Sequence, residues 1–430
     1  MPLDTRPSFS NQFPAPPEAV PARLQGIIYS GAFANLGIGY LIVYITGYMP
    51  AIGIKTSSIG LLIGVFGLVP ILTGIPLGML SDRKGRKTLL LLGSFGIFPA
   101  LTIFALTTNL SYLMISAVLL GLSEAASLTT WNAIIADQTT TQNRTKAFSL
   151  SFIISTVFIG LGSAIPITFP YLQQVLHLDS TTVHTDLMWA VSFLSLASPL
   201  LLLFLLRDYR EVIRPLQKRS RETRGNLRTL LKFSGINSLI GLGAGFIVPL
   251  IPTWFFLKFG VADTYSGPLL AVSQITIGMS AIGSARLSKT YGPVRAIVLT
   301  TGLSTVFMLS LAFVNNAALA AGLYIIRAAL MNMASPLMDS YLMGIITPEQ
   351  RGLASAINSI IWRLPNSVST IAGGIILGAG SYSLPFILAA SLYATAVILF
   401  FSVFRNVTPR IEIETIIREE PGLSLEIQEP

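Results

Sequence analysis

Long apolar runs separated by short polar turns dominate this chain of 430 residues. Each run is about 20 residues or longer, the length at which an α-helix crosses the hydrocarbon core of a bilayer. The pattern therefore predicts twelve transmembrane helices. We expect them at residues 24–49, 56–80, 88–107, 111–136, 146–170, 187–206, 229–257, 264–287, 294–313, 317–346, 353–379 and 384–405.

Composition places these runs in a membrane and not in a soluble core. Hydrophobic residues make up 52% of the chain, charged residues only 11%, and the mean hydropathy is +0.70. The net charge of +9 would fit a nucleic-acid partner, but the basic residues gather in the loops on one side of the predicted helices. Only Lys55 and Lys258 fall on the other side. Because short basic loops stay in the cytoplasm, we expect a multi-pass protein of the plasma membrane, surrounded by lipid, with both termini cytoplasmic and no nucleic-acid partner.

One short turn between the second and third predicted helices carries an acid and four bases. It runs from Gly78 to Lys87 and reads GMLSDRKGRK. This turn resembles the signature loop of the major facilitator superfamily: Gly, three residues, Asp, Arg or Lys, one residue, Gly, one residue and a basic pair. The resemblance implies two six-helix bundles, transport by alternating access, and an ion pair between Arg86 and Asp137 at the end of the fourth helix.

The two halves of the chain look like copies of each other. A shift of 207 residues places Gly60 on Gly267 and Arg144 on Arg351. Parallel repeats of this kind are related by an axis along the membrane normal, and the substrate site lies at their interface. We therefore predict an all-α membrane protein of two six-helix bundles related by pseudo-two-fold symmetry. Its segments would be a cytoplasmic tail (1–23), the first bundle (24–206), a basic linker (207–228), the second bundle (229–405) and a second cytoplasmic tail (406–430).

Asp82 in the charged turn needs a positive partner on the same side of the membrane. The candidate is the start of the eleventh helix, where the sequence TPEQ at 347–350 combines a capping box with proline at the first helical position. A helix N-terminus stabilises a partly buried carboxylate by about 1–2 kcal/mol, so Asp82 would clamp the two halves together. In the second copy Lys289 takes the place of Asp82, which predicts a clamp on one side only.

The alternative is a solvated loop, which explains the exposed bases of the turn well. Gly78 and Gly85 would allow a close helix approach and a tight turn. The residues that we assign to a conformational gate are Gly78, Asp82, Arg83, Gly85, Arg86, Asp137, Arg144 and Arg351.

Charges inside the predicted helices indicate a polar cavity. Glu124, Arg327 and Arg363 would each cost about 2.5–3.5 kcal/mol at the centre of a bilayer, so each must face a cavity or a partner. Glu124 could carry a proton or be satisfied by a neighbour such as Trp131. The arginines could be structural partners of Glu124 or of carbonyls in the tenth helix, or they could bind an anionic substrate. Asp339 lies near the inner surface and could pair with Arg351 or with the basic linker. The candidate residues of a substrate or proton cavity are Asn35, Glu124, Trp131, Arg327 and Arg363.

These features favour a secondary transporter. The chain has no cysteine and no Walker-type loop, and we expect no enzyme activity, cofactor or metal site. His177 and His184 fall in the one sizeable outer loop, between Tyr171 and Asp186, and are interpreted as solvated. We predict a monomer that moves a small organic solute by alternating access, coupled to a proton or another ion, and we favour export of a drug or metabolite. Two alternatives stay open: an organic-anion uptake carrier that uses the intramembrane arginines, and a non-transporting receptor or lipid-handling protein on the same fold.

Overall fold

The computed structural model describes residues 19–140, 143–209, 225–346 and 351–407, and every regular element in these ranges is helical. The first half contains α1 Ala22–Val43, η1 Tyr44–Tyr48, α2 Met49–Ala51, α3 Thr56–Lys84, α4 Arg86–Leu106, α5 Leu110–Asp137, α6 Arg144–Ala164, η2 Ile165–Thr168, α7 Phe169–Leu176, α8 Ser180–Ser195 and α9 Ala197–Leu205. The second half contains α10 Gly225–Gly245, η3 Val248–Leu250, α11 Ile251–Phe259, α12 Asp263–Tyr291, α13 Pro293–Leu311, α14 Ala317–Ile345, α15 Arg351–Gly378 and α16 Leu384–Phe404.

Eleven helical stretches of the described chain are long and apolar enough to cross a membrane. The remaining long helix, α12, has 29 residues and fills the place of the eighth predicted span. Several spans consist of more than one piece, because a proline removes a backbone hydrogen bond at Pro166 in η2 and at Pro249 in η3. The all-helical membrane fold expected from the sequence is confirmed.

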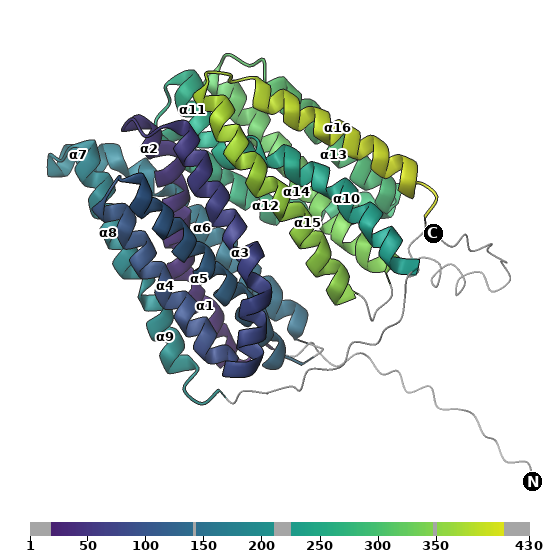
Figure 1. Cartoon of the computed structure of the whole chain (residues 1–430), viewed down its shortest axis with the longest axis horizontal. Helices are drawn as coiled ribbons and strands as arrows, with labels where there is room; N and C mark the ends of the chain where they lie inside the picture. The colour runs from purple at the N-terminus through teal and green to yellow at the C-terminus, as the bar shows by residue number, and fades with distance from the viewer. Residues whose placement is uncertain (1–18, 141–142, 210–224, 347–350, 408–430) are drawn as a thin grey trace, which may run out of the picture.

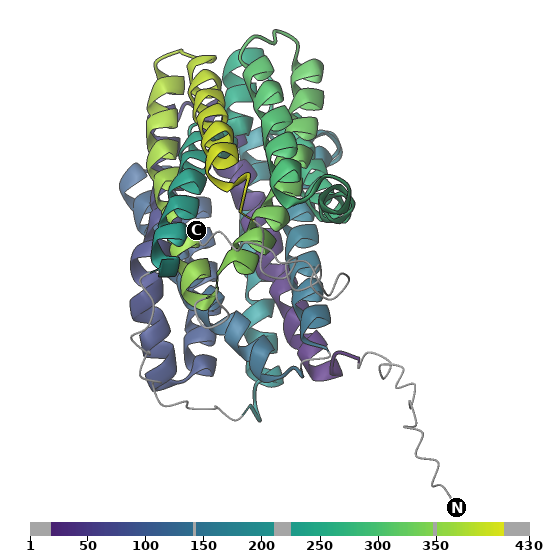
Figure 2. The same ribbon diagram turned by 90° about the vertical axis from the view of Figure 1, so that its right-hand side faces the viewer.

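The helices form two bundles that lie side by side. Helices α1–α9, coloured purple to teal, make the first bundle, and α10–α16, coloured teal to yellow, make the second (Figure 1). Figure 2 shows the same helices running roughly parallel along the long direction of the bundles. The bundles meet mainly where α3 packs against α15 and α6 packs against α12.

We name the two ends of the bundles by their turns. The basic face carries the turn between α3 and α4, with Arg83 and Lys84 exposed. The opposite face carries the turns at 52–55 and 379–383. In Figure 1 the bundles approach each other near α2 and α11, at the opposite face, and spread apart toward the basic face.

Contacts between the bundles repeat with the predicted shift of 207 residues. The hydroxyl of Thr253 donates a 2.6 Å hydrogen bond to the carbonyl oxygen of Thr46, its own copy 207 positions earlier. Gly60 packs against the Thr370 carbonyl, and its copy Gly267 packs against the carbonyl of Ser163, which is the copy of Thr370. Residues touch their own copies only near a symmetry axis, so these contacts place a pseudo-two-fold axis between the bundles.

Among the described residues, glycines close the seam between the two bundles toward the opposite face and not at the basic face. A Cβ at Gly60 would lie 2.8 Å from the Cα of Gly374, so the backbones of α3 and α15 touch there. Further along α3, no atom of the described residues lies within 4 Å of a Cβ built at Gly74 or Gly78. The close helix approach that we expected at Gly78 is therefore wrong for this conformation, because the bundles have separated at the basic face.

Candidate transport site

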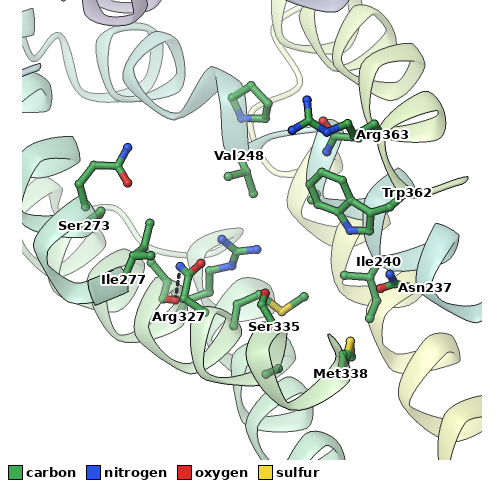
Figure 3. Close-up of a pocket in the computed structure, with 18 of the residues that line it drawn as sticks. Asn237, Ile240, Val248, Ser273, Ile277, Arg327, Ser335, Met338, Trp362 and Arg363 are labelled. Carbon is green, nitrogen blue, oxygen red and sulfur yellow. Dashed lines mark hydrogen bonds between the residues drawn. The ribbon is translucent and has the colours of Figure 1, made fainter. Parts of the chain in front are cut away.

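A cavity of about 710 Å³ lies between the two bundles (Figure 3). Helices α10, α12, α14 and α15 supply most of its wall, and Ile42, Ile159 and Ser163 line it from the first bundle. Its polar lining includes Asn237, Gln274, Arg327, Asn332, Asp339, Asn358, Arg363 and Asn366. Both bundles therefore contribute to one polar cavity, at the interface where the repeat predicted a site.

A second cavity of about 350 Å³ lies within the first bundle. Three of the predicted cavity residues, Asn35, Glu124 and Trp131, line it together. The amide of Asn35 donates to the Ser155 hydroxyl at 3.2 Å, and the indole N–H of Trp131 donates to the Ser151 hydroxyl at 2.8 Å. These partners fix two polar side chains of α1 and α5 against α6, while Glu124 is left for a different partner.

That partner is Arg363 of the second bundle. Its Nη1 lies 3.4 Å from Glu124 Oε1, with 42% of the arginine side chain and 32% of the glutamate side chain exposed. Glu124 lines the smaller cavity and Arg363 the larger one, and Ile159 borders both. The ion pair therefore joins the two bundles near the middle of α5 and α15, where the two cavities adjoin.

Arg327 lies on a different wall of the larger cavity, as Figure 3 shows. It is 4% exposed, and its Nη2 donates a 2.7 Å hydrogen bond to the hydroxyl of Tyr393. Its Nε has no hydrogen-bond partner, and no carboxylate of the described residues lies within 4.0 Å of its guanidinium. A buried cation without a counter-ion is costly, so this side chain can accept an anionic group.

The residues assigned to a gate lie at the basic face. Arg86 and Asp137 make the ion pair that the family resemblance implied, and the Tyr209 hydroxyl donates to the same carboxylate at 3.0 Å. Burial and this hydrogen bond raise the pKa of Tyr209 to about 12. Gly85 has a φ of 100° at the junction of α3 and α4, the tight turn for which a glycine was expected.

The rest of the predicted gate is only partly described. Arg83 is exposed, and Arg144 is exposed with its guanidinium 3.4 Å from the Ala136 carbonyl. The side chains of Asp82 and Arg351 and all of residues 347–350 lie outside the described part of the structure. The contact between Asp82 and the start of the eleventh helix therefore stays a prediction, as does the role of the whole gate.

A buried pair at the opposite face was not predicted from the sequence. His184 is 2% exposed and its Nε2 lies 2.8 Å from Oδ2 of Asp263. The expectation of a solvated outer loop from 171 to 186 is wrong for His184. The helix α7 continues to Leu176 and α8 begins at Ser180, so His184 lies within a helix. A signal for this start was present: Asp179 caps α8 by accepting hydrogen bonds from two backbone amides.

The family follows from a comparison of the whole sequence. The model of the Major Facilitator Superfamily matches residues 27–236 and 233–425. The chain belongs to the Major Facilitator Superfamily. It is thus a secondary transporter and not an enzyme, and the alternative of a non-transporting receptor or lipid-handling protein is set aside.

Curated relatives within this superfamily match a shorter stretch. Multidrug resistance protein 2 of Bacillus subtilis is 35% identical over 135 residues, which are 31% of this chain and 34% of the relative. Quinolone resistance protein NorA of Staphylococcus aureus is 31% identical over 131 residues, 30% of this chain and 34% of the relative. The similarity thus covers about a third of each protein.

Solved structures of the superfamily share the fold over most of the chain. A bacterial homolog to the human lysosomal transporter Spinster, in an inward-facing and occupied conformation, has a TM-score of 0.67 at 14% identity and covers 89% of this chain and 96% of that one. A variant of the nucleoside transporter NupG has a TM-score of 0.68 at 13% identity. The match covers 89% of this chain and 99% of that one. At these identities the likeness concerns the fold alone.

Proposed function

We propose that this transporter exports small organic solutes from the cell in exchange for protons. It would act as a monomer in the plasma membrane, with the basic face toward the cytoplasm because short loops rich in Lys and Arg stay there. The observation that carries the proposal is the ion pair between Glu124 and Arg363. Among the described residues, this ion pair links the two bundles at the cavity.

Protonation of Glu124 would remove the negative charge that holds Arg363. The carboxylate can be neutralised by a proton or matched by a cationic group of a solute, but not by both at once. Competition of this kind couples the solute to the proton, because each ligand stabilises the conformation that it binds best. The names of the two relatives concern resistance to multiple drugs and to quinolones. They support a drug-sized organic solute and transport out of the cell.

The test uses the purified full chain in proteoliposomes that are acidic inside. We expect a quinolone or a permanently charged lipophilic cation to accumulate inside in exchange for protons, above the level in protein-free liposomes, and this accumulation to stop when an ionophore removes the pH gradient. Glu124→Gln should abolish the dependence on the gradient. The control is Asp186→Asn, which changes an exposed carboxylate of α8 in the same way and should behave as wild type. Equal gradient dependence in Glu124→Gln and wild type would contradict the proposal.

A second candidate function is transport of organic anions. The observation that favours it is Arg327, which lines the larger cavity, is buried and has no carboxylate partner among the described residues. A carboxylate on the solute would supply the missing counter-ion, with Arg363 available as a second cation.

Uptake of a labelled aromatic carboxylate such as salicylate tests this candidate. Arg327→Gln should raise the KM for salicylate by about tenfold, the loss expected for one charge-assisted hydrogen bond of about 1.5 kcal/mol. Arg405→Gln, at an exposed position that follows α16, is the matched control. Wild-type proteoliposomes that move quinolones but no aromatic carboxylate would rule the candidate out.

We also propose that the turn from Gly78 to Lys87 gates the basic face. Asp82 would dock on the N-terminus of the eleventh span when that face closes, and Arg86 and Asp137 would fix the turn to the first bundle. At the corresponding place in the second bundle Lys289 is exposed, and a lysine is repelled by a helix N-terminus. The gate would therefore have one electrostatic clamp and not two.

A further inference from the structure

His184 and Asp263 form a buried contact across the seam between the bundles. His184 lies on α8 of the first bundle and Asp263 is the first residue of α12 in the second. The side chains are 2% and 7% exposed, and Nε2 and Oδ2 are 2.8 Å apart. The contact lies at the opposite face, where the cavity is closed. It must break before the cavity can open there.

The hydrogen bonds of His184 fix how many protons the pair holds. Its Nδ1 lies 2.6 Å from the backbone carbonyl oxygen of Ser180. A carbonyl oxygen can only accept, so Nδ1 carries a hydrogen and donates it. At 2.8 Å a second proton must lie between Nε2 and the Asp263 carboxylate, on either atom, because a nitrogen lone pair and a carboxylate oxygen repel each other. The closed contact therefore needs one proton that the separated pair can lose.

Aromatic rings keep water away from this proton. The ring of Tyr48 stacks on the imidazole with centroids 3.6 Å apart, and Phe169 meets it edge-on at 4.4 Å. The Tyr40 hydroxyl donates to the backbone carbonyl of His184 at 3.1 Å. In such surroundings an unpaired charge is strongly disfavoured, so loss of the shared proton would act directly on the contact.

Few other ionisable groups of the described residues lie around the pair. Tyr40, Tyr44 and Tyr48 face it from α1 and η1. On α8 the Asp179 carboxylate is occupied by the backbone amides of the first turn, and on α11 the Lys258 ammonium lies over the ring of Trp254. None of these groups ordinarily changes charge near neutral pH. A proton taken up or released at this contact in that range would therefore be held by the pair itself.

We propose that His184 and Asp263 are a proton-binding site that locks the opposite face. With the proton bound, the pair ties α8 to α12 and the cavity stays closed on that side. Without it, the imidazole lone pair meets the carboxylate and the bundles separate there. The proposal uses the alternating access of the superfamily but not the role proposed for Glu124. For one linked proton, the ratio of closed to open molecules changes by at most about tenfold per pH unit.

Distance measurements across the seam test this site without any substrate. The chain has no cysteine, so Ile52→Cys and Ser381→Cys place two spin labels on exposed turns of the two bundles at the opposite face. Pulsed electron paramagnetic resonance on the full chain in lipid nanodiscs would follow their separation from about pH 5 to about pH 9, which brackets the ordinary pKa of histidine. We expect a short distance in acid and a growing long-distance population as the pH rises.

Three variants decide the outcome. In His184→Gln the amide can still donate to an ionised Asp263, so the contact should persist and its pH response should disappear. Asp263→Asn should remove the response in the same way, by donating to the neutral imidazole. His177→Asn changes an exposed histidine at a left-handed position that asparagine tolerates, and should respond as wild type. A pH-independent wild type would overturn the proposal, and so would a full pH response in either His184→Gln or Asp263→Asn.

Discussion

Replacing Gly60 by alanine should favour opening at the opposite face. The new Cβ would lie 2.8 Å from the Cα of Gly374 and 2.8 Å from the carbonyl oxygen of Thr370. Both are backbone atoms of α15 and cannot rotate away, so α3 and α15 must separate by several tenths of an ångström. Overpacking of this kind costs about 1–3 kcal/mol.

This cost applies only to the conformation in which α3 and α15 touch at Gly60. It should therefore reduce the ratio of closed to open molecules by about 5- to 150-fold. The spin labels at positions 52 and 381 measure the effect as a larger long-distance population. Gly267→Ala, at the repeat copy, should shift the distances in the same direction, since its Cβ would meet the Ser163 carbonyl.

The control is Gly302→Ala on α13. No atom of the described residues lies within 4 Å of a Cβ at that position, and the site is inside one bundle. Its distances should match those of wild type. If Gly60→Ala leaves the distances unchanged, or if Gly302→Ala shifts them as much, the packing of α3 against α15 does not control opening.

Three further predictions concern the basic face. Because the pKa of Tyr209 is raised from about 10 to about 12, its contribution to stability is full below about pH 10 and is lost as the pH rises through about 12; melting curves should show a smaller alkaline loss in Tyr209→Phe than in wild type. Gly85→Ala should lower the free energy of unfolding by about 1–3 kcal/mol, since alanine is strained at a φ of 100°, and an unchanged melting temperature would contradict this. Asp82→Asn should increase thiol labelling of a cysteine at exposed position 355 on the cavity wall, whereas Asp208→Asn should leave the labelling rate as it is.

Hydropathy was sufficient to predict the spans because each one must satisfy its backbone within itself and face lipid. The residues of the second predicted span, 56–80, all lie in α3, which continues to Lys84. The clustering of Glu124 and Trp131 also follows from sequence, because residues seven apart lie on one face of a helix, and both line the same cavity. The partner of Glu124 was left open among several groups and required the packing of the two bundles.

The His184–Asp263 contact could not be predicted for a physical reason. The two residues are 79 positions apart and lie on different bundles, so no local pattern connects them. A short polar stretch around His184 has the composition of an outer loop, and only tertiary packing buries it. Gly78 shows the reverse case: its glycine spacing suits close packing, but no atom of the described residues lies within 4 Å of a Cβ built there, because the bundles have separated at the basic face.

The duplicated halves of the protein do not carry the same charge around the cavity. The first bundle supplies one acid, Glu124, whereas the second supplies two cations, Arg327 and Arg363, and one acid, Asp339, so its contribution is positive on balance. An amphoteric passenger would therefore travel in one orientation, with its positive end against the first bundle throughout the crossing. The two ends of such a molecule would then contact different halves of the protein. Substitutions in one bundle could therefore change the specificity for one end of the solute without affecting the other.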